Sequence, residues 1–187
     1  MEAFLVSTLV VAVGEIGDKT QLLALVLAAR FRRPLPIVLG ILVATVANHS
    51  VAGLVGEWVR QSLSPDTLRW TLGISFIAIG LWALKPDTLE ENPRTLGHYG
   101  VFLVTACAFF VAEIGDKTQL ATVALAARFD LLVAVVAGTT LGMLIADVPA
   151  VLLGDRAAPR IPMQAIRVAA AALFVVLGVG ALAGFGG

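Results

Sequence analysis

Two copies of one polar motif stand out because each places two acids and a lysine inside a long apolar segment. The first copy reads Glu-Ile-Gly-Asp-Lys-Thr-Gln-Leu over residues 15–22, and the second repeats it over residues 113–120. A carboxylate inside a membrane is costly and is usually kept for function. The two motifs are therefore the first candidates for chemistry.

The spacing within each motif predicts that its charged groups lie together. On a continuous helix, the acids and the lysine would be three and four residues apart and would share one face. The glycine between the acids would let another backbone approach, or let the helix unwind locally. We expect the two copies to face each other across a dyad. The predicted metal ligands are Glu15, Asp18, Gln21, Glu113, Asp116 and Gln119, with the hydroxyls of Thr20 and Thr118 in support.

Such an oxygen-rich site favours a hard divalent cation. Calcium, magnesium and manganese prefer these ligands, whereas softer metals prefer thiolate and imidazole. The four carboxylates, together with Lys19 and Lys117, leave a formal charge of minus two, which one divalent cation or two protons would neutralise. Desolvation disfavours the charged form of a carboxylate and a bound cation favours it. Cation binding and protonation should therefore exclude each other, as cation–proton exchange requires.

A purely structural alternative pairs each glutamate with the lysine of its own motif. Buried pairs of this kind are often no better for stability than apolar residues. They would also leave Asp18 and Asp116 without partners, so we favour function for the acids. The lysines could still serve only to tether and tune the acids, and the threonines could bond to carbonyls of their own helices.

A second apolar segment in each half adds polar groups near its middle. When the sequence is shifted by 98 residues, Asn48 and His49 fall opposite Ala146 and Asp147. Asp147 is an acid inside a membrane segment and is a candidate ligand or proton relay. His49 and Asn48 are candidates for a supporting role, with packing as the alternative for the histidine. The mismatch indicates that the two halves are not functionally equivalent.

Composition predicts an all-α protein embedded in a lipid bilayer. Of the 187 residues, 59% are hydrophobic and 14% are charged, against roughly 45–50% and about 25% in soluble domains. A net charge of zero gives no electrostatic case for a nucleic-acid partner. The sequence has no Gly-x4-Gly-Lys-(Ser/Thr) motif for ATP, and we expect neither an enzyme nor a bound cofactor beyond the transported cation.

Six segments are long enough to cross the roughly 30 Å hydrocarbon core of a bilayer. They cover about residues 3–29, 37–59, 69–84, 100–127, 131–154 and 166–183. The 98-residue shift continues beyond the motifs, since Gly40 matches Gly138, Gly56 matches Gly154 and Phe76 matches Phe174. The repeating unit is therefore three helices, over residues 1–85 and 100–187, joined by a cytoplasmic loop over residues 86–99.

An odd number of crossings per unit makes the second copy enter the membrane from the opposite side. That is an inverted repeat, which in many secondary transporters places the substrate site at mid-membrane between the halves. The basic residues set the orientation, because cytoplasmic loops carry an excess of them. Connections after the first, third and fifth segments carry Arg30, Arg32, Arg33, Lys85, Arg94, Arg156, Arg160 and Arg167. The other side carries Arg60, Arg69 and Arg128. We predict a plasma-membrane protein with both termini outside the cytoplasm.

Two copies of Glu-x-Gly-Asp-(Lys/Arg)-(Thr/Ser), at residues 15–20 and 113–118, resemble the Golgi calcium/manganese–proton exchanger family and its bacterial manganese exporters. The likeness extends to the six-segment plan and so to nearly the whole chain. It implies that Glu15, Asp18, Glu113 and Asp116 bind the cation, and that manganese leaves the cytoplasm in exchange for protons.

Three other functions compete with divalent-cation export. The acids could hold the ammonium group of an organic solute such as an amino acid, although no apolar specificity pocket is evident. The chain could be a scaffold without transport activity, which would leave the acids unexplained. An intramembrane aspartyl protease would need Gly-x-Gly-Asp, but Glu15 stands where the first glycine should be. Metal preference between manganese, calcium and magnesium, and the oligomeric state, stay open.

Overall fold

The computed structural model describes residues 1–85, 100–153 and 163–184, and this part of the chain is built of helices without strands. The predicted all-α class is confirmed. The helices are α1 (Glu2–Glu15), α2 (Lys19–Phe31), α3 (Pro34–Ser62), α4 (Pro65–Ala83), α5 (Val101–Glu113), α6 (Lys117–Arg128), α7 (Leu132–Leu153) and α8 (Met163–Leu182).

Each segment that carries a motif is two short helices instead of one long helix. The predicted segments over residues 3–29 and 100–127 are therefore unwound locally at the motif, which is one of the two outcomes that the glycine between the acids allows. The chain breaks between α1 and α2 at Gly17 and between α5 and α6 at Gly115, where φ is 83° and 74°. This left-handed conformation ends an α-helix and is open to glycine at little cost. Each half-helix of 12–14 residues is about 18–21 Å long, too short to cross a bilayer alone.

Three helices in the described ranges are long and apolar enough to cross a membrane by themselves: α3, α7 and residues 164–182 of α8. They correspond to the second, fifth and sixth predicted segments. Helix α4 contains the third, but its first turns include Asp66 and Arg69, so its apolar run is shorter.

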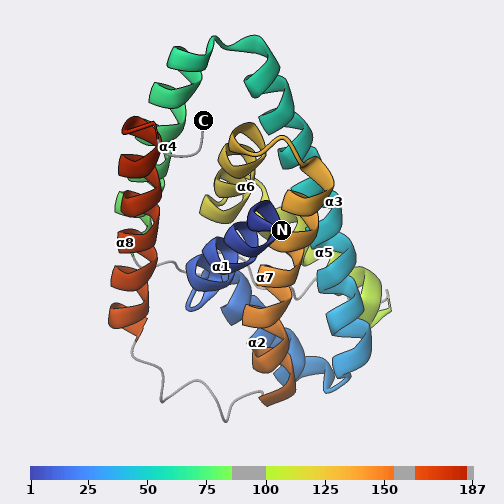
Figure 1. Ribbon diagram of the computed structural model, residues 1–187. Coiled ribbons are helices and arrows are strands. Elements are labelled where there is room, and N and C mark those ends of the chain that lie inside the picture. Colours follow the sequence, from blue (N-terminus) through green and yellow to red (C-terminus); the bar gives the residue numbers. More distant parts are fainter. Residues whose placement is uncertain (86–99, 154–162, 185–187) are drawn as a thin grey trace.

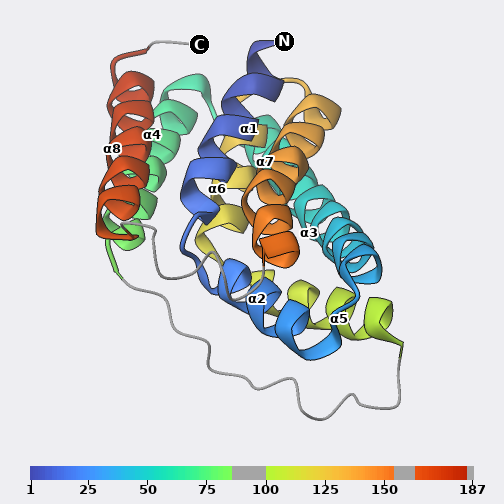
Figure 2. The same ribbon diagram turned by 90° about the horizontal axis from the view of Figure 1, so that it is seen from below.

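The helices pack in pairs that join the two halves of the sequence. Helix α1 lies against α7, α3 lies against α5 and α6, and α4 lies against α8. The α4–α8 pair stands to one side of the other helices, and α1 and α6 lie between this pair and α3 and α7 (Figures 1 and 2). Two of the short helices that carry the motifs, α1 and α6, are therefore held between the other helices of the bundle (Figure 2).

Glycines at matching positions of the two copies make matching contacts. A methyl group at Gly40 in α3 would lie 2.7 Å from Thr105 Cβ in α5, and one at Gly138 in α7 would lie 3.0 Å from Ser7 Cβ in α1. Gly138 is the partner of Gly40 after the 98-residue shift, and Thr105 is the partner of Ser7. The first copy thus contacts the second as the second contacts the first, as a two-fold axis between them would produce.

The α4–α8 pair has the same reciprocity. Gly80 of α4 packs against α8, and Gly178 of α8 packs against α4. Phe76 and Phe174, which are also matching positions, stack on each other with ring centroids 6.5 Å apart. Contact between equivalent residues is what a two-fold axis close to this ring pair would produce.

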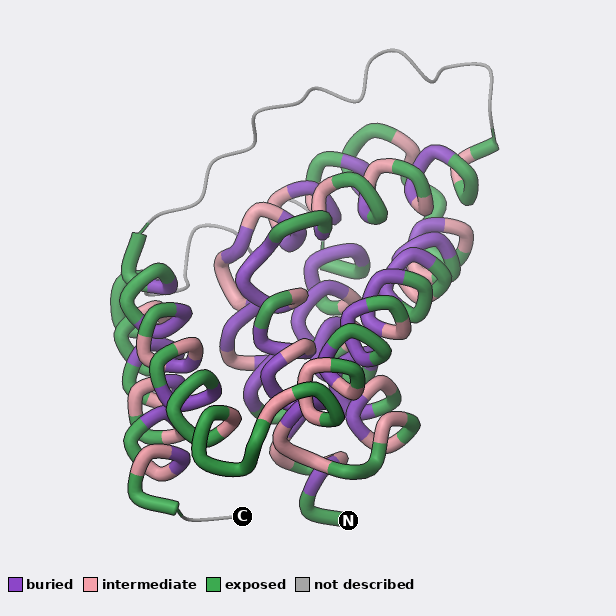
Figure 3. The backbone as a smooth tube through the Cα atoms, turned by 90° about the horizontal axis from the view of Figure 1, so that it is seen from above, coloured by how far each residue is buried: buried purple, intermediate pink, exposed green. Residues whose placement is uncertain are grey.

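Burial follows the same plan, with buried positions gathered between the helices and exposed positions facing outward (Figure 3). Many of the outward positions are large and apolar. Leu81, Val133 and Val176 are 62%, 81% and 67% exposed. A soluble protein rarely leaves so much apolar surface uncovered, whereas lipid would cover it.

Connections that the sequence analysis assigns to the same side of the membrane lie at the same end of the bundle. Arg60 at the end of α3 forms an ion pair with Asp130 between α6 and α7. At the opposite end (Figure 1), Arg32 and Arg33 line a pocket with Leu153 at the end of α7. The predicted loop over residues 86–99, and Arg94, Gly154, Arg156 and Arg160, lie outside the described residues.

Candidate metal centre

The break in each motif separates its glutamate from its aspartate. Glu15 is the last residue of α1 and Asp18 is the N-cap of α2, with the Asp18 N–H donating to the Glu15 carbonyl over 3.0 Å. Glu113 and Asp116 repeat this turn, again at 3.0 Å. The prediction that the acids share the face of one continuous helix is therefore wrong. They lie instead at the facing ends of two half-helices.

The two glutamines of the motifs close the turns. The Gln21 Oε1 accepts a hydrogen bond from the Gly17 N–H at 2.9 Å, and the Gln119 Oε1 accepts one from the Gly115 N–H at 2.7 Å. The Gln21 Nε2 also donates to the Ala146 carbonyl of α7 at 2.9 Å. A helix break leaves backbone N–H groups without helical partners. The two side-chain oxygens predicted as metal ligands are thus bonded to the backbone of the break.

The turn conformation leads to a first prediction on stability. Gly115→Ala should destabilise the fold by about 1–2 kcal/mol, because a side chain in the left-handed region costs that much. No atom lies within 4 Å of a Cβ added there, so crowding adds nothing. Gly100→Ala is a matched control, since its site is equally open and its φ is −60°. Thermal unfolding in detergent should show a lower melting temperature for Gly115→Ala and an unchanged one for Gly100→Ala. Equal melting temperatures would contradict the backbone explanation.

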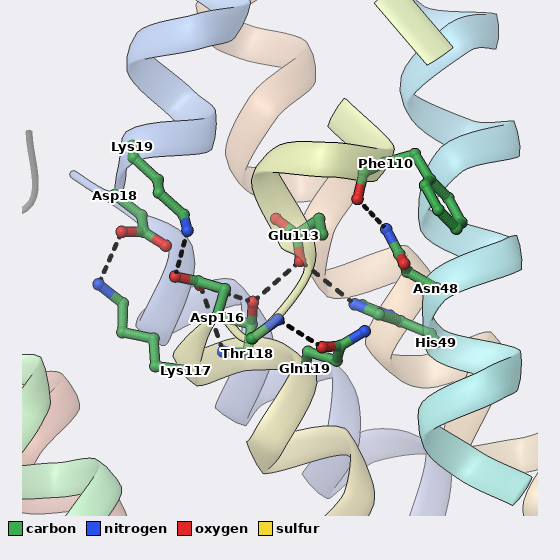
Figure 4. A network of polar contacts seen from close by, with 11 residues as sticks. Asp18, Lys19, Asn48, His49, Phe110, Glu113, Asp116, Lys117, Thr118 and Gln119 are labelled. Carbon is green, nitrogen blue, oxygen red and sulfur yellow. Dashed lines mark hydrogen bonds and ion pairs between the residues drawn. The ribbon is translucent and has the colours of Figure 1, made fainter. Parts of the chain in front are cut away.

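Two ion pairs cross between the motifs (Figure 4). Lys117 Nζ lies 2.7 Å from Asp18 Oδ1, and Lys19 Nζ lies 3.0 Å from Asp116 Oδ1. Each lysine therefore reaches the aspartate of the other copy. This differs from the alternative in which each lysine pairs with the glutamate four residues before it. The crossed pairs are a further reciprocal contact and tie the two breaks together.

Three of the four predicted acids come together in a buried group. Glu15, Glu113 and Asp116 each offer an oxygen, and these oxygens lie within 4.8 Å of one another. The three residues are at most 2% exposed. Two ligands of one ion at 2.1–2.5 Å can be at most about 4.2–5.0 Å apart, so the group has the dimensions of a cation site. Asp18 is outside this group.

The two copies differ in how their acids are hydrogen-bonded. The Thr118 hydroxyl lies 3.2 Å from both Glu113 Oε2 and Asp116 Oδ2. Within the described ranges, the Thr20 hydroxyl and both oxygens of Glu15 have no hydrogen-bond partner. A buried carboxylate without a partner is costly, and a bound cation would remove that cost.

Of the predicted supporting residues of α3 and α7, His49 and Asp147 interact with this group, whereas Asn48 bonds to the backbone of α5. Asn48 Nδ2 donates to the Phe110 carbonyl of α5 at 3.1 Å. His49 Nε2 is 3.9 Å from Glu113 Oε2 (Figure 4). Asp147 is fully buried, and neither of its oxygens has a hydrogen-bond partner in the described part of the chain. The structure thus adds a histidine and a further acid to the side chains around the breaks.

Comparison with known proteins shows the family of the chain. The chain matches the family described as "Divalent cation/proton antiporter GDT1" over residues 3–91 and 101–185. It is 47% identical over 178 residues to a Vibrio cholerae protein named "Putative manganese exporter", covering 95% of this chain and 88% of that protein.

Two more distant relatives carry the family name. A GDT1-like protein from Synechocystis sp. is 28% identical over 96% of both chains. GDT1-like protein 5 from Arabidopsis thaliana is 26% identical over 97% of this chain and 96% of its own. No solved structure matches the chain. The family match covers nearly the whole chain, as the motif resemblance implied, and the chain therefore belongs to the divalent cation/proton antiporter family GDT1.

Proposed function

We propose that this protein exports a divalent cation from the cytoplasm in exchange for protons, with Mn²⁺ as its main substrate and Ca²⁺ as the alternative. The observation that carries the proposal is the buried group of Glu15, Glu113 and Asp116, whose oxygens lie within 4.8 Å of one another. Carboxylate oxygens are the ligands that these cations prefer. The name of the Vibrio cholerae relative favours manganese.

Charge supports the exchange of the cation for protons. Glu15, Asp18, Glu113, Asp116 and Asp147 are all at most 2% exposed, and within the described residues two lysines, Lys19 and Lys117, form ion pairs with this set. The formal excess is three negative charges. Such an excess is costly in a low-dielectric interior. A bound divalent cation lowers it, and so do protons on the same carboxylates, so each should displace the other. Asp147 then serves as a ligand or proton relay beside the three-acid group.

The proposed architecture is six membrane crossings formed by two inverted three-helix repeats, over residues 1–85 and 100–187. Two observations support it. Matching residues of the two repeats make reciprocal contacts, and each repeat has a broken helix followed by two further helices. Broken helices at the repeat interface are where many transporters bind ions. The excess of basic residues in the connections on one side favours a protein of the plasma membrane with a cytoplasmic loop over residues 86–99 and both termini outside the cytoplasm.

The ligand chemistry and the relatives favour a metal ion over an organic cation. Oxygens within 4.8 Å of one another can all ligate one divalent ion, and the Vibrio cholerae relative is named for manganese. A scaffold without transport activity would keep fully buried carboxylates without any return in stability.

Reconstituted vesicles test the proposal directly. With an acidic lumen and a neutral exterior, external Mn²⁺ should enter and lumenal protons should leave, because the proton gradient drives exchange. A dye for each ion measures both fluxes, with empty vesicles and a proton ionophore as controls. Mn²⁺ movement without proton movement would refute exchange, and the absence of Mn²⁺ and Ca²⁺ movement would refute transport.

A further inference from the structure

We propose that His49 is a metal ligand of the three-acid group and that its nitrogen makes the site prefer Mn²⁺ to Ca²⁺ and Mg²⁺. The inference deepens the proposed function and rests on it, because it needs Glu15, Glu113 and Asp116 to bind a cation. It assigns to one side chain the preference between metals that the acids alone leave open.

His49 is buried against the acids with its hydrogen-bonding capacity unused. Its side chain is fully buried, and neither ring nitrogen has a hydrogen-bond partner among the described residues. A buried imidazole normally bonds through at least one nitrogen. The Nε2 points toward Glu113 and is 3.9 Å from its Oε2, too long for a hydrogen bond (Figure 4).

A separation of 3.9 Å is suited to two ligands of one ion. Ligands at about 2.1 Å from a cation are about 3.0 Å apart at a right angle and about 4.2 Å apart on opposite sides. The Nε2 to Oε2 distance lies between these limits. A cation between the two atoms would therefore use a nitrogen and an oxygen that are too far apart to bond to each other.

The fourth ligand, beside the three carboxylates, decides which metal ion binds most tightly. Calcium and magnesium are hard ions that take oxygen ligands, whereas imidazole suits transition metals. Mn²⁺ shares the preference of calcium and magnesium for carboxylates but, as a transition metal, also accepts an imidazole nitrogen. A histidine beside three carboxylates therefore favours it over the two alkaline-earth ions.

The other copy of the repeat carries an acid at this position. Asp147 of α7 matches His49 of α3 after the 98-residue shift, and both are fully buried. The chain therefore already contains, at the equivalent place, the oxygen donor that would suit calcium. His49→Asp would make the two copies alike at this position and should shift the preference from Mn²⁺ toward Ca²⁺.

Pulsed electron paramagnetic resonance on purified full-length protein loaded with Mn²⁺ tests the ligand directly. With ¹⁵N-labelled histidine, the Mn²⁺ signal should show a coupled nitrogen in the wild-type protein. The coupling should persist in His98→Gln, which replaces the other histidine of the sequence, and should vanish in His49→Gln. Absence of nitrogen coupling in wild-type protein with bound Mn²⁺ would overturn the proposal, even if the His49 variants failed to fold.

Competition between Mn²⁺ and Ca²⁺ tests the selectivity. His49→Gln should lower the ratio of Mn²⁺ to Ca²⁺ affinity at least about 10–100-fold, because that loss of metal affinity is typical even when only an outer partner of a metal ligand is changed. His49→Asp should lower the ratio further while keeping Ca²⁺ binding, which also shows that the variant is folded. An unchanged ratio in folded variants would overturn the proposal. If Mn²⁺ and protons are exchanged but the resonance signal shows no nitrogen, the role of His49 as a ligand is wrong and the proposed transport stands. If the signal shows the nitrogen but no Mn²⁺ is transported, the proposed transport is wrong and the role of His49 stands.

Discussion

Replacing Glu15 with leucine is expected to abolish Mn²⁺ transport and, at the same time, to raise the stability of the metal-free protein. Glu15 is fully buried and neither of its oxygens has a hydrogen-bond partner among the described residues. An unsatisfied buried polar group costs about 1–3 kcal/mol, which leucine would recover. Loss of one of the three clustered carboxylates should lower Mn²⁺ affinity at least ~100-fold, or about 2.7 kcal/mol.

Thermal melting without metal and Mn²⁺ binding by calorimetry separate the two effects. Glu2→Leu is the control, because Glu2 is an exposed acid in the first turn of α1 and should leave Mn²⁺ affinity unchanged. A lower melting temperature in Glu15→Leu would show that Glu15 stabilises the fold. Unchanged Mn²⁺ affinity would remove Glu15 from the metal centre.

Replacing Lys117 with methionine should destabilise the fold strongly. The Lys117 and Asp18 side chains are only 5% and 0% exposed. Removing one partner of a buried ion pair typically costs about 3–5 kcal/mol, because the other charge stays buried. The double variant Lys117→Met/Asp18→Leu should recover most of the loss, since apolar replacement of both partners is often neutral.

The second crossed pair supplies an internal comparison. Lys19 faces Asp116 in the equivalent geometry, but its side chain is 26% exposed. Solvent screens a partly exposed pair, so Lys19→Met should cost less than Lys117→Met. Chemical unfolding in detergent gives both values. Equal losses would show that exposure does not govern these pairs, and no recovery in the double variant would show that Lys117 stabilises through contacts other than Asp18.

The crossed pairs also bear on how the two halves could move. The Lys117 pair joins the first turn of α6 to the N-cap of α2, and the Lys19 pair joins the first turn of α2 to the N-cap of α6. The two pairs therefore connect α2 to α6 across the site. Movement that separates α2 from α6 at the site would break them. Because Lys19 is the more exposed lysine, we expect its pair to break first.

The sequence alone determined which residues to examine and how the chain repeats. The acids are recognisable because charge is rare inside apolar segments. The 98-residue spacing identified the matching glycines of the two copies, and the structure added that their contacts are reciprocal. The positions of α3, α7 and α8 followed from the length of their apolar runs.

The helix breaks had a local signal that periodicity alone does not interpret. Each motif has a glycine, followed four residues later by a glutamine whose side chain accepts the glycine N–H. In a continuous helix the same glutamine would be counted as a side chain facing the site. Only the backbone conformation at Gly17 and Gly115 distinguishes a cap from a ligand.

The partners of the charged groups were decided by tertiary structure. Spacing along one helix suggested lysine–glutamate pairs within a motif, yet the lysines reach aspartates of the other copy. The approach of His49 to Glu113 joins residues 64 positions apart in the sequence. Such contacts depend on the packing of α3 against α5 and α6, because long-range ion pairs and metal sites form where helices meet, and no local pattern records which helices those are.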